Sequence, residues 1–200
     1  LLIGIADNYG CLSDYTHTDA QGIREYLTLG ERYFQLSILS PEKTYYDARI
    51  SRPYIMYNDK NTDRPANHFL RLKEIWNNRD VILIEGSQTR AGVGNDLFSN
   101  TRSLKRIIGP ATNAFHRYDE LLYAALDCAP DDTLFLVALG PCAKPLVFDL
   151  VKSGHQAIDF GHIDIEYEWF LRHATQRIPI LNKYTNEALG GDTDISELDD

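Results

Sequence analysis

Short apolar runs of β-type composition recur along this chain, and most are separated by segments whose apolar residues have helical spacing. Strands that alternate with helices of about 10–15 residues form βαβ units, which build a mostly parallel sheet with helices on both faces. We therefore expect a Rossmann-like α/β fold. The expected strands are LLIGIA from Leu1, VILIEG from Val81, KRIIGP from Lys105, TLFLVALG from Thr133 and QAIDFG from Gln156, and the expected helices are 67–76, 115–126 and 144–151.

The length and composition favour one domain. The chain has 200 residues, of which 44% are hydrophobic and 24% charged, and this is enough apolar material for one good core. We assign residues 1–189 to that domain. The less regular stretch 14–57 is expected to be a helical excursion plus a lid. Residues 190–200, rich in Gly and Asp, are expected to form an acidic flexible tail or linker.

The charge and the apolar pattern restrict the partners. A formal net charge of -9 argues against nucleic acid, because binding phosphates needs clustered Lys and Arg. A small anion remains compatible if a divalent cation bridges it to carboxylates. No run approaches the roughly 18 apolar residues of a membrane span, and the first run has no basic region and cleavage site around it, so we do not expect it to be a signal peptide. We expect no membrane span and a cytoplasmic location. The three cysteines have no CxxC spacing, so neither a zinc site nor a disulfide framework is indicated.

In open α/β sheets ligands bind beyond the carboxyl ends of the strands, so the strand exits hold the candidate site. Glu85 ends the run VILIEG, and the glycines Gly92 and Gly94 follow it together with Arg90 and Asn95. Backbone amides of such a loop can cradle a phosphate, and a guanidinium beside them suits the same ligand. The alternative is a flexible turn with a helix cap. No dinucleotide fingerprint or P-loop is present.

Some charged residues have two open interpretations. Glu85 is either solvated at the edge of the sheet or directed into the cleft. Arg49 and Arg52, in the segment DARISRPY, are further basic candidates, and a surface loop is favoured for both.

The segment GHIDIEYEW alternates polar and apolar residues without a break. In a strand, one face would carry His162, Asp164, Glu166 and Glu168 while the apolar set is buried. On a helix, residues two apart point in nearly opposite directions, so Asp164 and Glu166 could not converge on one ion. We therefore expect an extended segment, either a solvated strand face or a site for Mg²⁺ or Mn²⁺ held by Asp164 and Glu166, with Glu168 one pleat too far.

Four blocks together resemble a known family: the GT-D type glycosyltransferases, once classed as the unknown-function domain 1792. They are EGxxxRAGVGNDLF at 85–98, KRIIGPATNAFHRYDE at 105–120, ALGPCAKPLVFDL at 138–150 and QAIDFGHIDIEYEW at 156–169. The resemblance implies a Rossmann-like domain, often part of a larger enzyme, with a metal ion at an Asp-x-Glu motif. Asp164 and Glu166 match that motif. The first run departs from the Arg-Phe-Gly-Asp-Gly-Glu form of many relatives and keeps only Asp7.

The resemblance implies a transferase that uses Mn²⁺ or Mg²⁺ and moves a sugar, typically glucose, from a UDP donor to a glycan. The expected acceptor is an O-linked glycan on a serine-rich repeat glycoprotein. The residues expected to bind the donor are Asp7, Arg90, Gly92, Gly94 and Asn95. Glu85 and Asp96 are the candidate general bases if the reaction inverts configuration. The alternatives are a metal-dependent phosphohydrolase or nucleotidyltransferase, and a non-catalytic module of a larger synthase that binds nucleotide or glycan.

Overall fold

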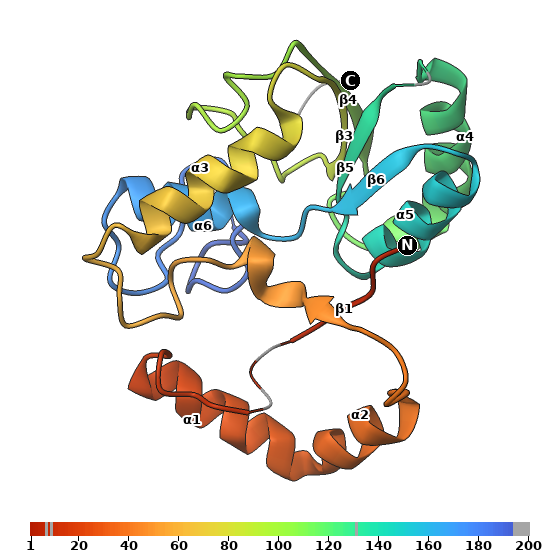
Figure 1. Cartoon of the computed structure of the whole chain (residues 1–200). Helices are drawn as coiled ribbons and strands as arrows, with labels where there is room; N and C mark the ends of the chain where they lie inside the picture. Colours follow the sequence, from red (N-terminus) through yellow and green to blue (C-terminus); the bar gives the residue numbers. More distant parts are fainter. Residues whose placement is uncertain (7, 9, 131, 194–200) are drawn as a thin grey trace.

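The computed structural model describes residues 1–6, 8, 10–130 and 132–193 (Figure 1). In chain order the elements are β1 (Gly4–Ile5), α1 (His17–Tyr26), the π-helical turn η2 (Leu27–Glu31), α2 (Arg32–Ile38), β2 (Tyr46–Asp47), the 3₁₀ turn η3 (Ala48–Ser51), α3 (Arg64–Trp76), β3 (Asp80–Gly86), β4 (Ser103–Gly109), η4 (Ala114–Arg117), α4 (Tyr118–Cys128), β5 (Leu134–Ala138), η5 (Gly140–Cys142), α5 (Ala143–Lys152), β6 (Gln156–Asp159) and α6 (Ile163–Leu171). The expected helices are confirmed as α3, α4 and α5, although residues 115–117 form a 3₁₀ turn before α4.

The main sheet has four parallel strands in the order β4-β3-β5-β6. The sequence predicted all four of these strands and their parallel direction, and the structure confirms both. The prediction that LLIGIA joins the same sheet is wrong. Its residues Gly4 and Ile5 pair instead with Tyr46 and Asp47 in a separate two-stranded sheet. A Cβ on Gly4 would lie 3.1 Å from the Cβ of Ala48, so this glycine allows the two backbones to approach closely.

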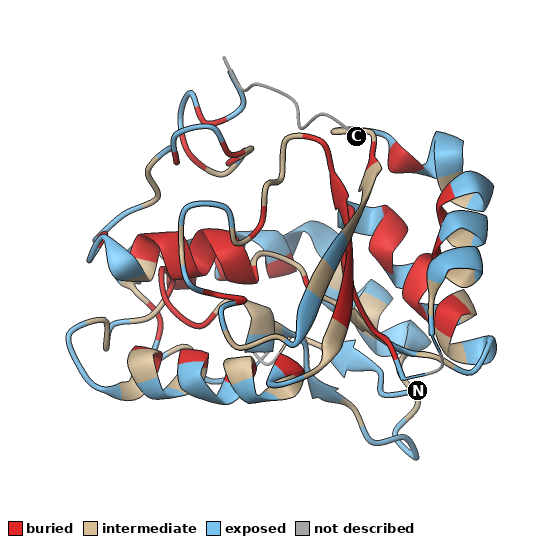
Figure 2. Cartoon of the chain, turned by 90° about the horizontal axis from the view of Figure 1, so that it is seen from above, coloured by how far each residue is buried: buried red, intermediate tan, exposed pale blue. Residues whose placement is uncertain are grey.

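Helices cover both faces of the main sheet, as expected. Along β3, Val81 and Leu83 join one buried cluster with the apolar residues of α3 and α6, whereas Ile82 and Ile84 join a second cluster with α4 and α5. This alternation follows from the period of two in a strand, and it explains why β3 is apolar on both faces. In Figure 2 the buried residues gather in the strands and on the helix sides that face them.

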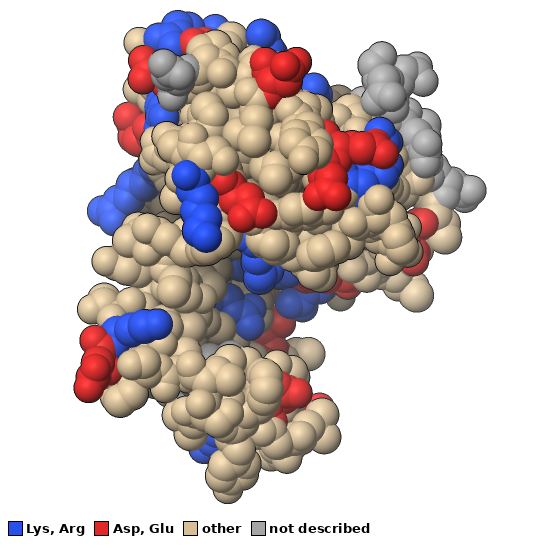
Figure 3. Space-filling model, turned by 90° about the vertical axis from the view of Figure 1, so that its right-hand side faces the viewer, with Lys and Arg blue, Asp and Glu red and all other residues tan. Residues whose placement is uncertain are grey.

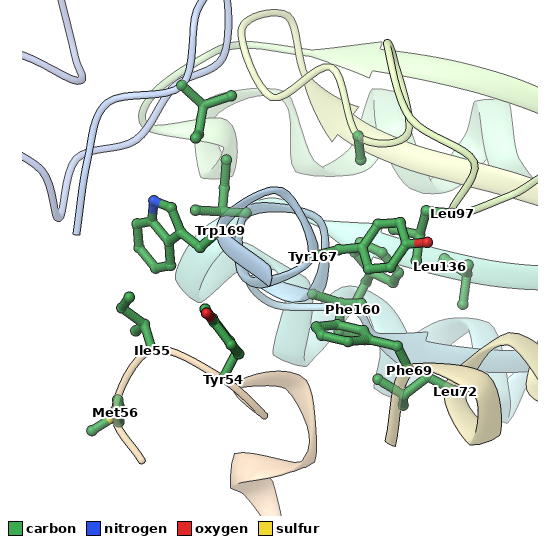
Figure 4. Close-up of a cluster of buried hydrophobic side chains, with 14 of the residues drawn as sticks. Tyr54, Ile55, Met56, Phe69, Leu72, Leu97, Leu136, Phe160, Tyr167 and Trp169 are labelled. Carbon is green, nitrogen blue, oxygen red and sulfur yellow. The ribbon is translucent and has the colours of Figure 1, made fainter. Parts of the chain in front are cut away.

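The segment GHIDIEYEW is a helix, and the prediction that it is extended is wrong. Helix α6 follows a turn at Gly161, whose φ of 56° suits glycine, and it has Asp164 and Glu166 in its first turn, where acidic side chains favour a helix N-terminus. Apolar residues surround α6, with Trp169 near Tyr54 on one side and Tyr167 near Phe69 on another (Figure 4). Because every residue from 163 to 169 is buried, the alternation does not mark one solvated face.

Residues 14–57 contain the expected helical excursion, α1 to α2, while the lid remains a prediction. Among the described residues, no helix has the length and apolar character that a bilayer span requires. Residues 190–193, at the start of the expected tail, form a turn in which Thr185 N–H donates to Gly191 O at 2.6 Å. Residues 194–200 lie outside the described residues.

Candidate functional site

The loops after the four parallel strands lie at one edge of the sheet, where Gly86 of β3 pairs with Gly109 of β4 and Glu85 with Ala138 of β5. The glycine loop, residues 86–98, follows β3 at this edge, and α6 begins just after β6. Most of the predicted site residues therefore belong to neighbouring segments, as the rule for parallel sheets leads one to expect.

Glu85 is fully buried and points into the glycine loop. One carboxylate oxygen accepts the Ala91 N–H at 2.8 Å, and the other pairs with the Arg106 guanidinium. Arg106 also donates to Ala91 O at 2.7 Å, so β4 and the loop are held together. Burial raises the pKa of Glu85, although Arg106 and the Ala91 N–H partly oppose this. These contacts hold the start of the loop in place, and they favour a positioning role for Glu85 over that of a general base.

Several residues of the glycine loop have a positive φ, a backbone conformation that glycine adopts readily. Arg90, Gly92 and Gly94 have φ values of 52°, 74° and 81°, in the region that L-residues seldom adopt. A Cβ on Gly92 would lie 2.4 Å from the Phe98 ring, whereas nothing lies within 4 Å of one on Gly94. The Gly92 N–H already donates to Asp164 Oδ1 at 2.7 Å. In this conformation the Gly92 amide anchors the loop to α6 and does not face a ligand.

An ion cluster of Asp164, Glu168, Lys183 and Asn95 joins α6 to the glycine loop and to the C-terminal segment. The Lys183 ammonium lies 2.7 Å from Asp164 and 2.9 Å from Glu168, and all three side chains are 4% exposed. The Asn95 amide donates to Asp164 at 3.0 Å and to Glu168 at 2.7 Å. The two carboxylates are four residues apart, and that spacing places them on one face of a helix.

The pKa of Glu168 is lowered, because hydrogen bonds from Lys183, Asn95 and Arg172 outweigh the effect of burial, which acts the other way. Glu168 is therefore ionised at neutral pH beside the Lys183 side chain. The sequence argument had set Glu168 aside as a spare charge, but here it is bound as closely as Asp164.

Glu166 faces a different part of the molecule. It is fully buried, and its Oε2 accepts the N–H groups of Tyr54 and Ile55, each at 2.9 Å. Burial raises its pKa to about 7, with the two N–H groups acting in the opposite direction. Its Oε1 has no hydrogen-bond partner among the described residues. Glu166 thus fastens the segment before α3 to α6.

The arrangement of Asp164 and Glu166 does not fit one shared metal ion. They bind different partners, and the Lys183 ammonium takes the place of a cation beside Asp164. Within residues 1–6, 8, 10–130 and 132–193, no group of three or more His, Cys, Asp or Glu side chains could hold a metal ion.

A second cluster lies beside the start of α6. Arg52 donates to both carboxylate oxygens of Glu187, at 2.6 and 3.0 Å, and contacts His162 Nδ1 at 2.9 Å. Arg177 lies 3.3 Å from Glu187 and 2.7 Å from Asp19 of α1. Burial would raise the pKa of Glu187, but Arg52, with help from the other cations, lowers it to about 2. Arg52 is therefore partly buried and paired; the surface-loop interpretation of this residue is wrong.

Asp96 is the more accessible of the two proposed bases. Its side chain is 61% exposed, and it accepts hydrogen bonds from Lys73 at 2.8 Å and from the Tyr167 hydroxyl at 2.6 Å. The pKa of Asp96 is lowered, mainly by Lys73. Asp7 lies outside the described residues.

Lys and Arg side chains gather in the hollow between the main body and the lower lobe in Figure 3. This concentration of positive charge contrasts with the net charge of -9 of the whole chain. Such a hollow is electrostatically suited to an anionic ligand.

Sequence reasoning missed Lys183 and Arg106 and undervalued Glu168. The four-residue spacing of Asp164 and Glu168 was a signal for their pairing, had the segment been taken as a helix. Lys183 lies in a segment without helix or strand, and its spacing offers no comparable signal.

The family model described as glycosyltransferase GT-D fold matches residues 1–188. The chain is 46% identical over 156 residues to the probable glycosyl transferase Gly of Streptococcus gordonii, covering 78% of this chain and 22% of that protein. It is 41% identical over 162 residues to the glycosyltransferase GlyD of Streptococcus pneumoniae, covering 81% of this chain and 19% of that protein. The chain thus spans about a fifth of the length of these two relatives.

The solved structures that resemble this chain are also described as glycosyltransferases or as having a glycosyltransferase fold. One, described as a highly conserved domain of unknown function 1792 with a distinct glycosyltransferase fold, has a TM-score of 0.88 and 39% identity, covering 100% of this chain and 70% of that one. Another, described as a new glycosyltransferase (domain of unknown function 1792) from Streptococcus sanguinis, has a TM-score of 0.89 and 38% identity, covering 100% of this chain and 73% of that one.

Proposed function

The chain belongs to the GT-D glycosyltransferase family, and from that premise we propose that it transfers a sugar, with glucose expected, from a UDP-sugar to a glycan. The observation that carries the proposal is the match to the family along nearly the whole chain. The expected acceptor is an O-linked glycan on a serine-rich repeat glycoprotein. Because the relatives are several times longer, we further propose that the domain works within a larger glycosyltransferase.

The basic groups near the sheet edge support the choice of an anionic donor. A sugar-diphosphate carries negative charge that grows on the leaving oxygen during transfer, and fixed cations stabilise that charge best where water is scarce. The cations are Arg90 of the glycine loop and Arg52, which contacts His162 at the start of α6; burial lowers the pKa of His162, so this ring is a neutral hydrogen-bonding group. We propose that these groups face the diphosphate.

Asp96 is the better candidate for the base in an inverting transfer. It is exposed, whereas Glu85 is enclosed by Arg106 and the loop backbone. The lowered pKa of Asp96, caused by its hydrogen bonds with Lys73 and Tyr167, makes it a weaker base, so its accessibility to an acceptor hydroxyl is what favours it over Glu85.

Dependence on Mn²⁺ or Mg²⁺ remains part of the proposal, but its site is not the Asp164 and Glu166 pair in the described conformation. A divalent ion would supply positive charge to the departing UDP when bound. Since the residues do not fit it here, we derive no step of the transfer through the ion.

UDP release from a panel of UDP-sugars, with and without Mn²⁺ and glycan acceptors, tests the proposal. The expected result is release that requires the acceptor and is largest with UDP-glucose. An Asp96→Asn variant should lose most of this activity, while Asp63→Asn, a matched change at the start of α3, should retain it. Release that ignores the acceptor would indicate a phosphohydrolase. Binding without turnover in this chain, with turnover in a longer one, would indicate a non-catalytic module.

A further inference from the structure

The Glu187 carboxylate is held by side chains from three separate segments. It accepts two hydrogen bonds from Arg52, at 2.6 and 3.0 Å, and one from Arg177 at 3.3 Å. His162 Nε2 lies 3.2 Å from the same carboxylate. A guanidinium donates its hydrogen bonds in a planar fork that fits a phosphate as well as a carboxylate. The cluster therefore suits an anion of either kind, and Glu187 is the anion that it holds here.

The His162 ring adds a neutral donor to this cluster. Arg52 contacts Nδ1 of the ring at 2.9 Å, and because a guanidinium only donates, Nδ1 must accept and the ring proton must be on Nε2. Burial lowers the pKa of His162, and the charge of Arg52 acts in the same direction, which agrees with a neutral ring. Since Nε2 is the nitrogen beside Glu187, this tautomer places an N–H on the side of the bound carboxylate.

The chain around Glu187 is fixed to the candidate site by other residues. We call residues 183–188 the C-terminal strap. Lys183 lies 2.7 Å from an acidic side chain of α6, and the Tyr184 N–H donates to Gln88 O of the glycine loop at 2.8 Å. Among the described residues, the backbone groups of Glu187 make no backbone hydrogen bond. Rotation of the Glu187 side chain can therefore release the cluster while the strap stays in place.

A dissolved anion can reach this cluster, because its side chains are only partly buried. The exposed fractions of Arg52, Glu187 and Arg177 are 21%, 24% and 29%. Arg177 also lies 2.7 Å from Asp19. If Glu187 turned away, Asp19 alone among the described carboxylates would remain paired with the two guanidiniums. The cluster would then carry positive charge that an incoming anion could neutralise.

We propose that Arg52, Arg177 and His162 form a binding site for a diphosphate, and that Glu187 occupies this site until the diphosphate displaces it. The inference rests on the proposed function, because the diphosphate would be that of the UDP-sugar. Arg177 would then bind the donor, and Glu187 would compete with it. The alternative is a structural ion pair that only ties the strap to the segment around Arg52. That alternative predicts no gain in anion affinity when the Glu187 charge is removed.

Calorimetry with inorganic pyrophosphate tests the proposal, since this probe carries neither sugar nor nucleoside. Glu187→Gln keeps the shape of the side chain but removes its charge, so pyrophosphate should bind about 10-fold more tightly, as expected when one charge-assisted contact no longer competes. Asp80→Asn is the matched control, because it removes the same charge from a pair with Arg102 at the opposite edge of the sheet. It should bind pyrophosphate as the parent does. Adding Arg52→Gln to Glu187→Gln should abolish the gain.

Glu187→Ala, which removes the whole carboxylate, should show the gain as well, and thermal melting checks that each variant is folded. Equal pyrophosphate affinity in the parent and both Glu187 variants would overturn the proposal. An equally large gain in Asp80→Asn would overturn it too, because the net charge alone would then explain the effect. Sugar transfer is judged separately: tighter pyrophosphate binding by the Glu187 variants, without UDP release from any UDP-sugar, would support this site and refute the proposed function.

Discussion

Replacing Lys183 by Met should remove a large share of the stability of this domain. The Lys183 ammonium is 4% exposed and lies 2.7 and 2.9 Å from two carboxylates that are equally buried. Removing one partner of a buried pair leaves an uncompensated charge and costs about 3–5 kcal/mol. Domains of ordinary stability unfold with about 5–15 kcal/mol, so the loss would be a substantial fraction of the total. Met keeps the length and the apolar stem, which limits the change to the charge.

Urea unfolding at neutral pH measures the loss. Lys144→Met is the matched control, because Lys144 is 75% exposed and lies 3.4 Å from Asp159. Surface pairs contribute about 0–1 kcal/mol. Adding Asp164→Asn and Glu168→Gln to Lys183→Met should recover part of the stability by neutralising the stranded carboxylates. If Lys183→Met costs no more than Lys144→Met, the cluster does not stabilise the fold and the reasoning fails.

Three further predictions address pH, the glycine loop and the metal. The pKa of Glu187 in the fold is about 2 against an ordinary 4.5, so ionised Glu187 contributes to the free energy of unfolding above pH 4.5, and this contribution is lost as the pH falls toward 2. Glu187→Gln should therefore flatten the decline of the urea midpoint between pH 4.5 and 2. A decline as steep as that of the parent would contradict this prediction. Gly92→Ala should lower the free energy of unfolding more than Gly94→Ala, because the new Cβ at residue 92 meets the buried Phe98 ring. Gly94→Ala bears only the penalty for a positive φ, about 1–2 kcal/mol. Equal melting temperatures of the two variants would count against this. UDP should bind more weakly to the parent in EDTA than in Mn²⁺ by calorimetry, and equal affinities would remove the metal from the proposed function.

The four-stranded sheet could be predicted because its strands carry a local signal. Runs such as VILIEG are apolar without interruption and end in glycine, which is typical of strands buried on both faces. The rule that ligands bind at the carboxyl ends of strands then selected the glycine loop and the start of α6, and these two segments are in direct contact through Gly92 and Asp164.

Helix α6 could not be recognised from alternation, because its polar side chains are buried with partners that the sequence does not reveal. Asn95 precedes Asp164 by 69 residues and Lys183 follows it by 19, and neither pairing has a local signal. The first run, LLIGIA, has strand composition but pairs with residues 46 and 47 outside the main sheet. Composition predicts a strand, but the choice of its neighbour depends on the path of the whole chain.

The distance along the chain between Asp164 and Lys183 has a consequence for synthesis on the ribosome. A growing polypeptide lengthens by about 5–20 residues per second, so the 19 residues between them take about 1–4 s to add. During that interval α6 has its two acidic side chains but not the Lys183 ammonium that pairs with both of them. Nascent chains that stop before residue 183 would keep α6 loosely packed and susceptible to proteases, and the domain acquires its final packing only as its last residues emerge.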